Sequence, residues 1–174
     1  MKKFEEIKGL CKIVDLKKLR RTEGVFFDAV PDEFIKDLSG VDRVIHISNA
    51  VSPGSIKNVE RPWYMHPYQS DNLLVLSGIR HIDLYSKEHG KVENFVVTNN
   101  KIFMNGELVC DQPAVLTWPP HVFHRVESKE QGSSSINFAQ RTDGFDIKDN
   151  FSIYDLNVNT GDFHVIREGH RDQF

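Results

Sequence analysis

The sequence contains little cysteine and no long apolar run. Its two cysteines, Cys11 and Cys110, are far apart and form no C-x-x-C pair, so we expect two reduced thiols rather than a disulfide framework. No segment approaches the roughly 20 apolar residues that cross a bilayer. The N-terminal stretch carries acids where a secretion signal has an apolar centre. We therefore expect a cytoplasmic protein with no membrane partner.

The sequence also lacks an excess of positive charge. It has 22 basic and 25 acidic side chains, a net charge of −3 and a pI of about 6.2. A general nucleic-acid binder needs a concentrated basic field to replace the counterions of phosphate. The one basic cluster, at residues 17–21, is flanked by acids and is predicted to be a solvated helix face or loop. Nucleic acid is therefore not expected as a partner.

The length of 174 residues suits a single domain. Apolar residues near positions 4–11 recur at helical spacing and predict a short amphipathic helix. A proline, early acids and a closing glycine predict a second short helix over residues 31–40. We therefore predict an N-terminal helical decoration over residues 1–40 and a single domain over residues 41–174.

Strand signals dominate the rest of the chain. An alternating run covers residues 42–48, and from residue 61 onward short strand-like runs recur with turn residues between them. Asn105-Gly106 between alternating residues is a strong hairpin signal. A last hairpin is predicted over residues 151–166, with Gly161 in its turn. Short strands at this spacing indicate an all-β sandwich or barrel rather than alternating strands and helices.

Two stretches concentrate the residues that bear chemistry. In Tyr64–Gly78, His66 lies five residues before Asp71, which in turn lies seven residues before a glycine. In Trp118–Arg125, His124 lies on another predicted strand. If the two strands meet, His66, Asp71 and His124 form a pocket suited to a metal or a polar ligand.

These stretches resemble the two sequence motifs of the cupin superfamily. The first motif, G-x5-H-x-H-x3/4-E-x6-G, places His66 at its second histidine, Asp71 at its glutamate and Gly78 at its closing glycine. The second motif, G-x5-P-x-G-x2-H-x3-N, places Pro119 at its proline and His124 at its histidine. The resemblance implies an all-β fold, the cupin double-stranded β-helix or jelly roll, here with short N-terminal helical segments and a β-barrel domain that ends in a hairpin.

The resemblance is partial at the ligand positions. Tyr64 stands where the family has its first histidine, Asp71 replaces a glutamate, and His121 replaces the glycine of the second motif. Shifting the first motif makes His66 its first histidine and Tyr68 its second, but the acid and the glycine then fit less well. In either alignment a tyrosine replaces one of the family's three histidine ligands.

The residue chemistry and the resemblance together suggest a divalent transition metal (Fe, Mn, Ni or Zn). His66, Asp71 and His124 would form the two-histidine, one-carboxylate triad that suits non-haem iron. Tyr64 or Tyr68 would act as the catalytic proton donor beside the metal. A metal-free ligand pocket and a purely structural role for these residues remain as alternatives.

The favoured hypothesis is a metal-dependent cupin enzyme that acts on a small polar metabolite as a dioxygenase, isomerase or decarboxylase. An alternative resembles the cupin-type deoxysugar-nucleotide epimerases, which need no metal and would use His66, Tyr64 and Asp83. Their diphosphate site needs several arginines, and those near the motifs are Arg61, Arg80 and Arg125. A third alternative is a ligand-binding cupin without catalysis. The resemblance and the edge strands also imply a homodimer.

Other polar residues are second-tier candidates. In the strand after Gly78, His81 and Asp83 alternate with an arginine and two aliphatic residues, and either face could point inward. An exposed position is favoured for His81 and Asp83, and for His46 two strands earlier. Gln69 is expected in a solvated turn.

Overall fold

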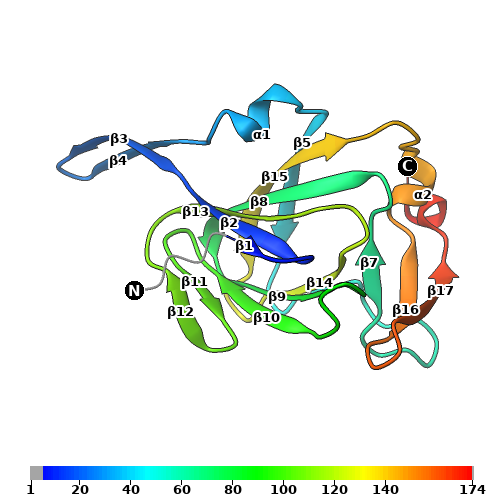
Figure 1. Ribbon diagram of the computed structural model, residues 1–174. Coiled ribbons are helices and arrows are strands. Elements are labelled where there is room, and N and C mark those ends of the chain that lie inside the picture. The colour runs from blue at the N-terminus through cyan, green and yellow to red at the C-terminus, as the bar shows by residue number, and fades with distance from the viewer. Residues whose placement is uncertain (1–5, 174) are drawn as a thin grey trace.

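The computed structural model describes residues 6–173 of the chain. Two antiparallel sheets face each other, and a separate two-stranded hairpin extends from them (Figure 1). This arrangement confirms the predicted all-β jelly-roll fold.

The smaller of the two main sheets contains six strands. Along the sheet their order is β1 (Glu6–Ile7), β2 (Cys11–Asp15), β13 (Ala114–Trp118), β8 (Gln69–Gly78), β15 (Ser133–Arg141) and β5 (Gly40–His46). The longest pairing joins β8 to β15, which brings residues from the first motif beside a strand some 65 positions later in the chain.

The larger sheet contains nine strands. Its order is β12 (Glu107–Cys110), β11 (Ile102–Met104), β10 (Glu93–Val97), β9 (Arg80–Tyr85), β14 (Phe123–Glu127), β7 (Trp63–Met65), β16 (Ile153–Asn157) and β17 (Asp162–Arg167), with β6 (Val51–Ser52) paired to β14. The predicted closed barrel is wrong, because within residues 6–173 the edge strands of one sheet pair with no strand of the other. The domain is a sandwich of two open sheets.

The core lies between the two sheets. Alternation places Leu73 and Val75 of β8, and Ile82 and Leu84 of β9, on the inward faces, where all four are buried. Burying a side chain of this size contributes roughly 1.5–3 kcal/mol. A second buried cluster packs around Phe123 where β7, β14 and β16 meet. The cavity described below opens beside these packed regions.

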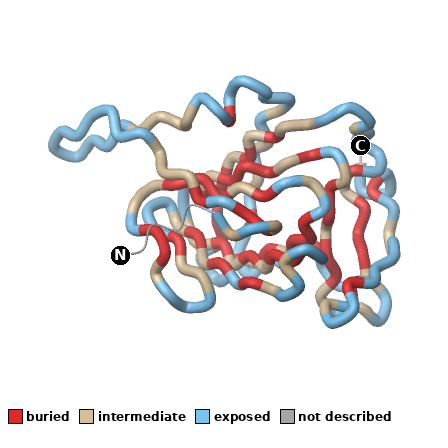
Figure 2. Tube along the Cα trace, viewed as in Figure 1, coloured by how far each residue is buried: buried red, intermediate tan, exposed pale blue. Residues whose placement is uncertain are grey.

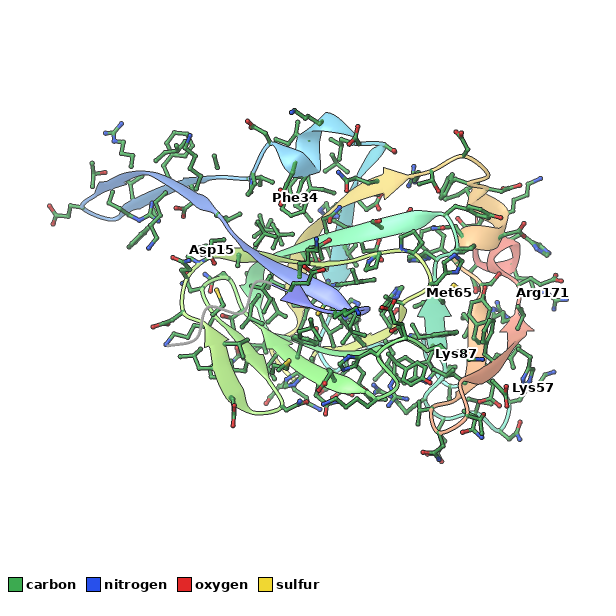
Figure 3. The ribbon with its side chains drawn as sticks, in the orientation of Figure 1. Asp15, Phe34, Lys57, Met65, Lys87 and Arg171 are labelled. Atoms are coloured by element: carbon green, nitrogen blue, oxygen red, sulfur yellow. The ribbon has the colours of Figure 1, made fainter. Side chains whose placement is uncertain are left out.

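The helix predicted near residues 4–11 is wrong for the residues that the structure describes. Residues 6–15 form β1 and β2, and β2 completes the six-stranded sheet by pairing with β13. Cys11 and Ile13 are buried while Lys12 between them is exposed, which is the period of a strand. The second predicted helix is present as α1 (Glu33–Lys36), and Phe34 anchors it against the sheet (Figure 3).

The basic cluster lies on a strand rather than on a helix or loop. It belongs to β3 (Lys17–Thr22), which pairs with β4 (Val25–Ala29) to form a hairpin that projects from the body of the molecule (Figure 2). The hairpin exposes apolar side chains as well as basic ones, with Phe26 77% and Phe27 54% accessible. We refer to β3 and β4 as the hairpin arm.

Two predicted hairpins are present. Asn105 and Gly106 both have positive φ angles, 51° and 84°, and connect β11 to β12 as a tight turn. The last hairpin joins β16 to β17 through a turn that contains Gly161. The short helices α2 (Ile147–Asn150) and η1 (Gly169–Asp172) flank it. None of the helices described for residues 6–173 is long and apolar enough to cross a membrane.

Gly78, the closing glycine of the first motif, forms the corner between the two sheets. Its φ is +71°, and a Cβ atom there would lie 2.2 Å from the carbonyl oxygen of Gly132. Only glycine fits such a close approach at a positive φ. The chain thus leaves β8 in one sheet and enters β9 in the other. Arg80 is the first residue of β9 and is buried.

Candidate active site

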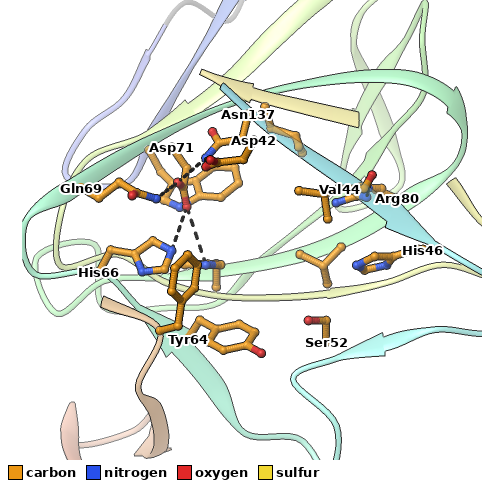
Figure 4. Close-up of a pocket in the computed structure, with 15 residues that line it drawn as sticks. Asp42, Val44, His46, Ser52, Tyr64, His66, Gln69, Asp71, Arg80 and Asn137 are labelled. Carbon is orange, nitrogen blue, oxygen red and sulfur yellow. Dashed lines mark hydrogen bonds and ion pairs between the residues drawn. The ribbon is translucent and has the colours of Figure 1, made fainter. Parts of the chain in front are cut away.

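A cavity of about 390 Å³ lies between the two sheets. Figure 4 shows it with a cluster around Asp71 on one side and Arg80 with His46 on the other. We call the first the aspartate end (His66, Asp71, His124) and the second the arginine end (His46, Arg80). The remaining lining residues are Asp42, Val44, Ser52, Tyr64, Gln69, Leu73, Trp118, Val126, Asn137 and Phe151.

His66 follows directly after β7 and is buried. Its Nδ1–H donates to the carbonyl oxygen of Asn150 at 2.5 Å, at the end of α2. This bond fixes the orientation of the ring, so that Nε2 faces the Asp71 Oδ2 atom at 3.2 Å. The short helix α2 therefore holds a side chain of the first motif in place.

Asp71 is the centre of the cluster. Its Oδ1 accepts hydrogen bonds from Gln69 Nε2 at 2.7 Å and from Asn137 Nδ2 at 2.8 Å. Its Oδ2 lies 3.2 Å from Nε2 of His66 and 3.8 Å from Nε2 of His124. One carboxylate oxygen is held by amides, and the other is shared by two imidazoles.

His124 comes from β14, in the opposite sheet to Asp71. Its Nδ1 contacts the carbonyl oxygen of Val122 at 3.3 Å, and its ring lies 4.7 Å from the ring of His66. Trp118 packs against it with ring centroids 5.3 Å apart. The two sequence stretches thus meet, as predicted, and bring His66, Asp71 and His124 together.

The surroundings of His66 and His124 shift the pKa values of the two side chains in opposite directions. Burial and the neighbouring charge of His66 together lower the pKa of His124 to about 4, although the Asp71 carboxylate acts in the opposite direction. Burial also opposes protonation of His66, but the Asp71 carboxylate outweighs it and raises the pKa of His66. Burial disfavours the Asp71 carboxylate, yet the two histidines and Gln69 hold the pKa of this group well below its usual range. Near pH 6 the cluster holds a carboxylate, an imidazolium and a neutral imidazole.

The same three side chains fit a divalent metal. One ligand atom from each of His66, Asp71 and His124 lies within 4.8 Å of the others. Both Nδ1 atoms are directed at carbonyl oxygens, which leaves both Nε2 atoms facing the aspartate. Histidine ligands of metal sites are typically held in this way.

The two tyrosines occupy different places. Tyr64 lines the cavity, as does Ser52, and burial raises the pKa of Tyr64. Tyr68 is 44% exposed and is not among the residues that line the cavity, so the structure does not place this predicted catalytic residue at the site. His121 lies in the turn before β14, with a φ of +67°, and also stays outside the cavity.

Several residues around the cavity differ from the sequence-based expectation. Gln69 was expected in a solvated turn but is buried at the start of β8, two residues before Asp71 and on the same face. His46 and Arg80 line the cavity, whereas His81 and Asp83 do not. The sequence signal for Arg80 is its alternation with the aliphatic Ile82 and Leu84 of β9, because this apolar face is the inner one.

The other two arginines near the motifs are engaged elsewhere. Arg61 binds Glu127 at 2.6 Å. Arg125 binds Asp83 at 2.7 Å and lies over the ring of Trp63. Neither lines the cavity.

No protein-family model matches the chain, and a sequence comparison with curated proteins finds no relative. Solved structures do match. A dTDP-sugar isomerase from Desulfovibrio desulfuricans superposes with a TM-score of 0.57 at 13% identity, covering 79% of this chain and 82% of the other. The RmlC epimerase of Mycobacterium tuberculosis superposes with a TM-score of 0.56 at 10% identity, covering 82% and 68%. The chain has a cupin fold.

A third match within the cupin fold has a bound sugar nucleotide. A variant of the 3,4-ketoisomerase QdtA from Thermoanaerobacterium thermosaccharolyticum, in complex with TDP-4-keto-6-deoxyglucose, superposes with a TM-score of 0.53 at 14% identity. The alignment covers 81% of this chain and 85% of the other. The superpositions show a shared fold, and at sequence identities this low they show nothing more. The chemistry of the site must therefore be argued from its own residues.

Proposed function

We propose that the chain is an isomerase or epimerase of a keto sugar, which moves a proton within the cluster of His66, Asp71 and His124 without a metal. The observation that carries the proposal is the single Asp71 oxygen shared by two imidazole Nε2 atoms at the wall of the cavity. The shared fold with sugar isomerases and an epimerase supports the same class of reaction.

The chemistry follows from the two protonation states. The neutral Nε2 of His124 accepts the proton from the carbon next to the ketone, and the positive charge of the His66 imidazolium, paired with Asp71, stabilises the developing enolate oxygen. Return of the proton to the neighbouring carbon, with transfer of a hydroxyl proton between the two oxygens, gives the isomeric ketone. Return to the opposite face of the same carbon gives the epimer. Neither route needs an oxidant or a reductant.

Tyr64 serves as a neutral donor beside this cluster. Because its pKa is raised, the hydroxyl keeps its proton at neutral pH. Its ring centroid lies 5.9 Å from that of His124, so the two side chains form adjoining parts of the cavity wall. We assign Tyr64 to hydrogen-bonding of the sugar oxygens, and Tyr68 has no part in this mechanism.

The metal-dependent reading is the second candidate. It is favoured by the two Nδ1 atoms directed at carbonyl oxygens, which leave Nε2 of His66 and of His124 beside Asp71. A bound divalent cation would polarise a carbonyl oxygen of the substrate. Metal analysis of protein produced with iron, manganese, nickel and zinc available separates the two candidates: stoichiometric metal, lost in both His66→Ala and His124→Ala, would replace the metal-free proposal.

The proposal is tested by proton exchange. TDP-4-keto-6-deoxyglucose and free keto sugars are incubated with chelator-treated protein in D₂O, and deuterium at the carbon next to the ketone is followed by NMR. We expect exchange with at least one keto sugar, and a rate about 10³-fold lower with His66→Asn. Binding of these sugars without any exchange would contradict the proposal and favour a non-catalytic ligand-binding cupin.

We also propose that the protein is a homodimer in which the hairpin arm packs on a second copy. Phe26 and Phe27 on this two-stranded arm are largely exposed, and an isolated hairpin is marginal in water without further packing. Light scattering should give the mass of a dimer for the wild type and of a monomer for the Phe26→Ser, Phe27→Ser variant. A monomeric wild type would overturn this assignment.

A further inference from the structure

The arginine end of the cavity holds a buried cation that lacks a carboxylate partner (Figure 4). Arg80 is 3% exposed. Its Nε donates to Ser133 Oγ at 3.1 Å, and one Nη donates to the carbonyl oxygen of Val44 at 3.1 Å. Across residues 6–173, its other Nη forms no hydrogen bond and its guanidinium forms no ion pair.

A buried guanidinium without a counter-charge is unusual. Buried charges in proteins are normally paired, because removing an ion from water is costly. Burial lowers the pKa of Arg80 to about 10, so the group still carries its charge at neutral pH. Its remaining Nη can donate to an oxygen of a carboxylate, and a hydrogen bond of this kind is strengthened because both groups are charged. The cavity therefore offers an anion a site that the protein itself leaves unfilled.

The neighbouring side chains fix this arginine in place and add a second donor. Ser133 Oγ, which accepts from Arg80, also bonds Ser128 Oγ at 2.7 Å. Ser128 Oγ in turn contacts His46 Nδ1 at 3.3 Å. This chain of contacts joins Arg80 to His46 and leaves the second ring nitrogen of His46 without a partner among the described residues. Both side chains line the cavity.

The charges of the cavity orient an anionic ligand. Asp71 and Asp42 lie at the other side, bridged by the Asn137 amide, and would repel a second anion there. Arg80 is the one arginine or lysine among the lining residues. A diphosphate carries more than one negative charge, whereas a single carboxylate matches a single guanidinium. The cavity of about 390 Å³ is near the lower end of the roughly 300–1,000 Å³ of ligand sites.

We propose that the arginine end binds a carboxylate of the substrate, which makes the substrate a keto sugar acid held by Arg80 and His46 with its keto group toward Asp71. The position of the keto group rests on the function proposed above. Binding of the carboxylate does not depend on it, and this permits a separate test.

The test uses D-glucuronate, D-glucose and TDP as probes, with affinities measured by calorimetry. D-Glucuronate should bind at least about tenfold more tightly than D-glucose, because a hydrogen bond to a charged group is worth about one to two powers of ten in affinity. Arg80→Met should abolish this difference, and Arg80→Lys should restore part of it. The matched control is Arg125→Met, whose arginine lies outside the cavity and which should keep the full difference.

Three outcomes would overturn the proposal. They are equal affinity for D-glucuronate and D-glucose, a preference that survives in folded Arg80→Met, and Arg80-dependent binding of TDP that exceeds that of D-glucuronate. Should Arg80→Met fail to fold, the proposal is tested instead by NMR of the side-chain Nε–H resonance of Arg80 in the wild type. It should shift with D-glucuronate and not with D-glucose, and the absence of a shift would contradict the assignment.

The two proposals fail in different ways. If His66→Asn and the wild type both bind D-glucuronate through Arg80 while no keto sugar exchanges deuterium, the carboxylate site stands and the isomerase function falls. If a keto sugar exchanges but the wild type shows no preference for a carboxylate, the function stands and the carboxylate site falls.

Discussion

The two ends of the cavity use similar residues to opposite effect. At the aspartate end, Asp71 lies between two histidines, and its charge is compensated by His66. At the arginine end, Arg80 lies beside the neutral His46, and no carboxylate among residues 6–173 forms an ion pair with Arg80. A site whose charges are already balanced is suited to moving protons, whereas a site with an unbalanced charge is suited to holding a ligand of the opposite sign.

The histidines show the same contrast. His66 and His46 are both buried, yet the pKa of His66 is raised by Asp71, while burial and the charge of Arg80 lower the pKa of His46 to about 4. The sign of the nearest charge, rather than burial alone, decides whether the ring is an acid or a neutral hydrogen-bonding group.

The largest expected effect is on catalysis at the aspartate end. His66→Asn removes the positive charge that stabilises the enolate oxygen, and we expect the deuterium exchange rate to fall about 10³-fold, within the range for a lost electrostatic stabiliser of the transition state. The measurement is NMR of the keto sugar in D₂O. A variant that is folded and keeps more than a tenth of the rate would show that the reaction does not depend on His66.

The next effect is on stability. Asp71→Asn leaves the buried charge of His66 without its partner, so we expect the free energy of unfolding at pH 6 to fall by about 3 kcal/mol. Urea unfolding measures this change. Asp83→Asn is the matched control, because Asp83 pairs with Arg125 in a less buried place and its loss should cost about 1 kcal/mol or less. Equal decreases in the free energy of unfolding for Asp71→Asn and Asp83→Asn would contradict the claim that Asp71 compensates a buried charge.

A smaller effect concerns pH at the arginine end. Because the pKa of His46 is about 4 in the folded protein and about 6.5 in the unfolded chain, the unfolded state binds a proton more readily and stability falls as pH decreases from 6.5 to 4. His46→Gln should lose about 2 kcal/mol less than the wild type over this range. Urea unfolding at a series of pH values tests this, and parallel curves would contradict it.

The smallest effect is expected for the tyrosines. Tyr64→Phe removes one hydrogen bond to the sugar, and we expect the exchange rate to fall about tenfold, the equivalent of about 1.4 kcal/mol. Tyr68→Phe is the matched control and should leave the rate unchanged, because this ring lies outside the cavity. A larger loss in Tyr68→Phe than in Tyr64→Phe would reverse the assignment of the two residues.

Part of this architecture could be predicted from the sequence because it depends on local signals. Turn residues such as Asn105-Gly106, and the spacing of Asp71 to Gly78, identified the strands and the jelly roll. The first motif predicted His66 and Asp71 as site residues and the second motif predicted His124, and the structure brings the three together.

The rest depends on tertiary pairing that local patterns do not encode. β2 is a strand because β13 offers it an edge, and β1 pairs in turn with β2, although the spacing of their apolar residues also suits a helix. The inward face of β5 carries His46, while the aliphatic Ile45 points outward and is exposed, so apolar alternation alone could not say which face was inner. Arg80 lies inward beside Ile82 for the same reason.

The most direct test of the central claim is histidine NMR of the protein produced with transition metals available and studied at pH 6. The metal-free account predicts that His66 is an imidazolium with both ring nitrogens protonated and that His124 is neutral with an unprotonated Nε2. Neutral rings at both His66 and His124, with both Nε2 atoms bound to a stoichiometric metal, would contradict it.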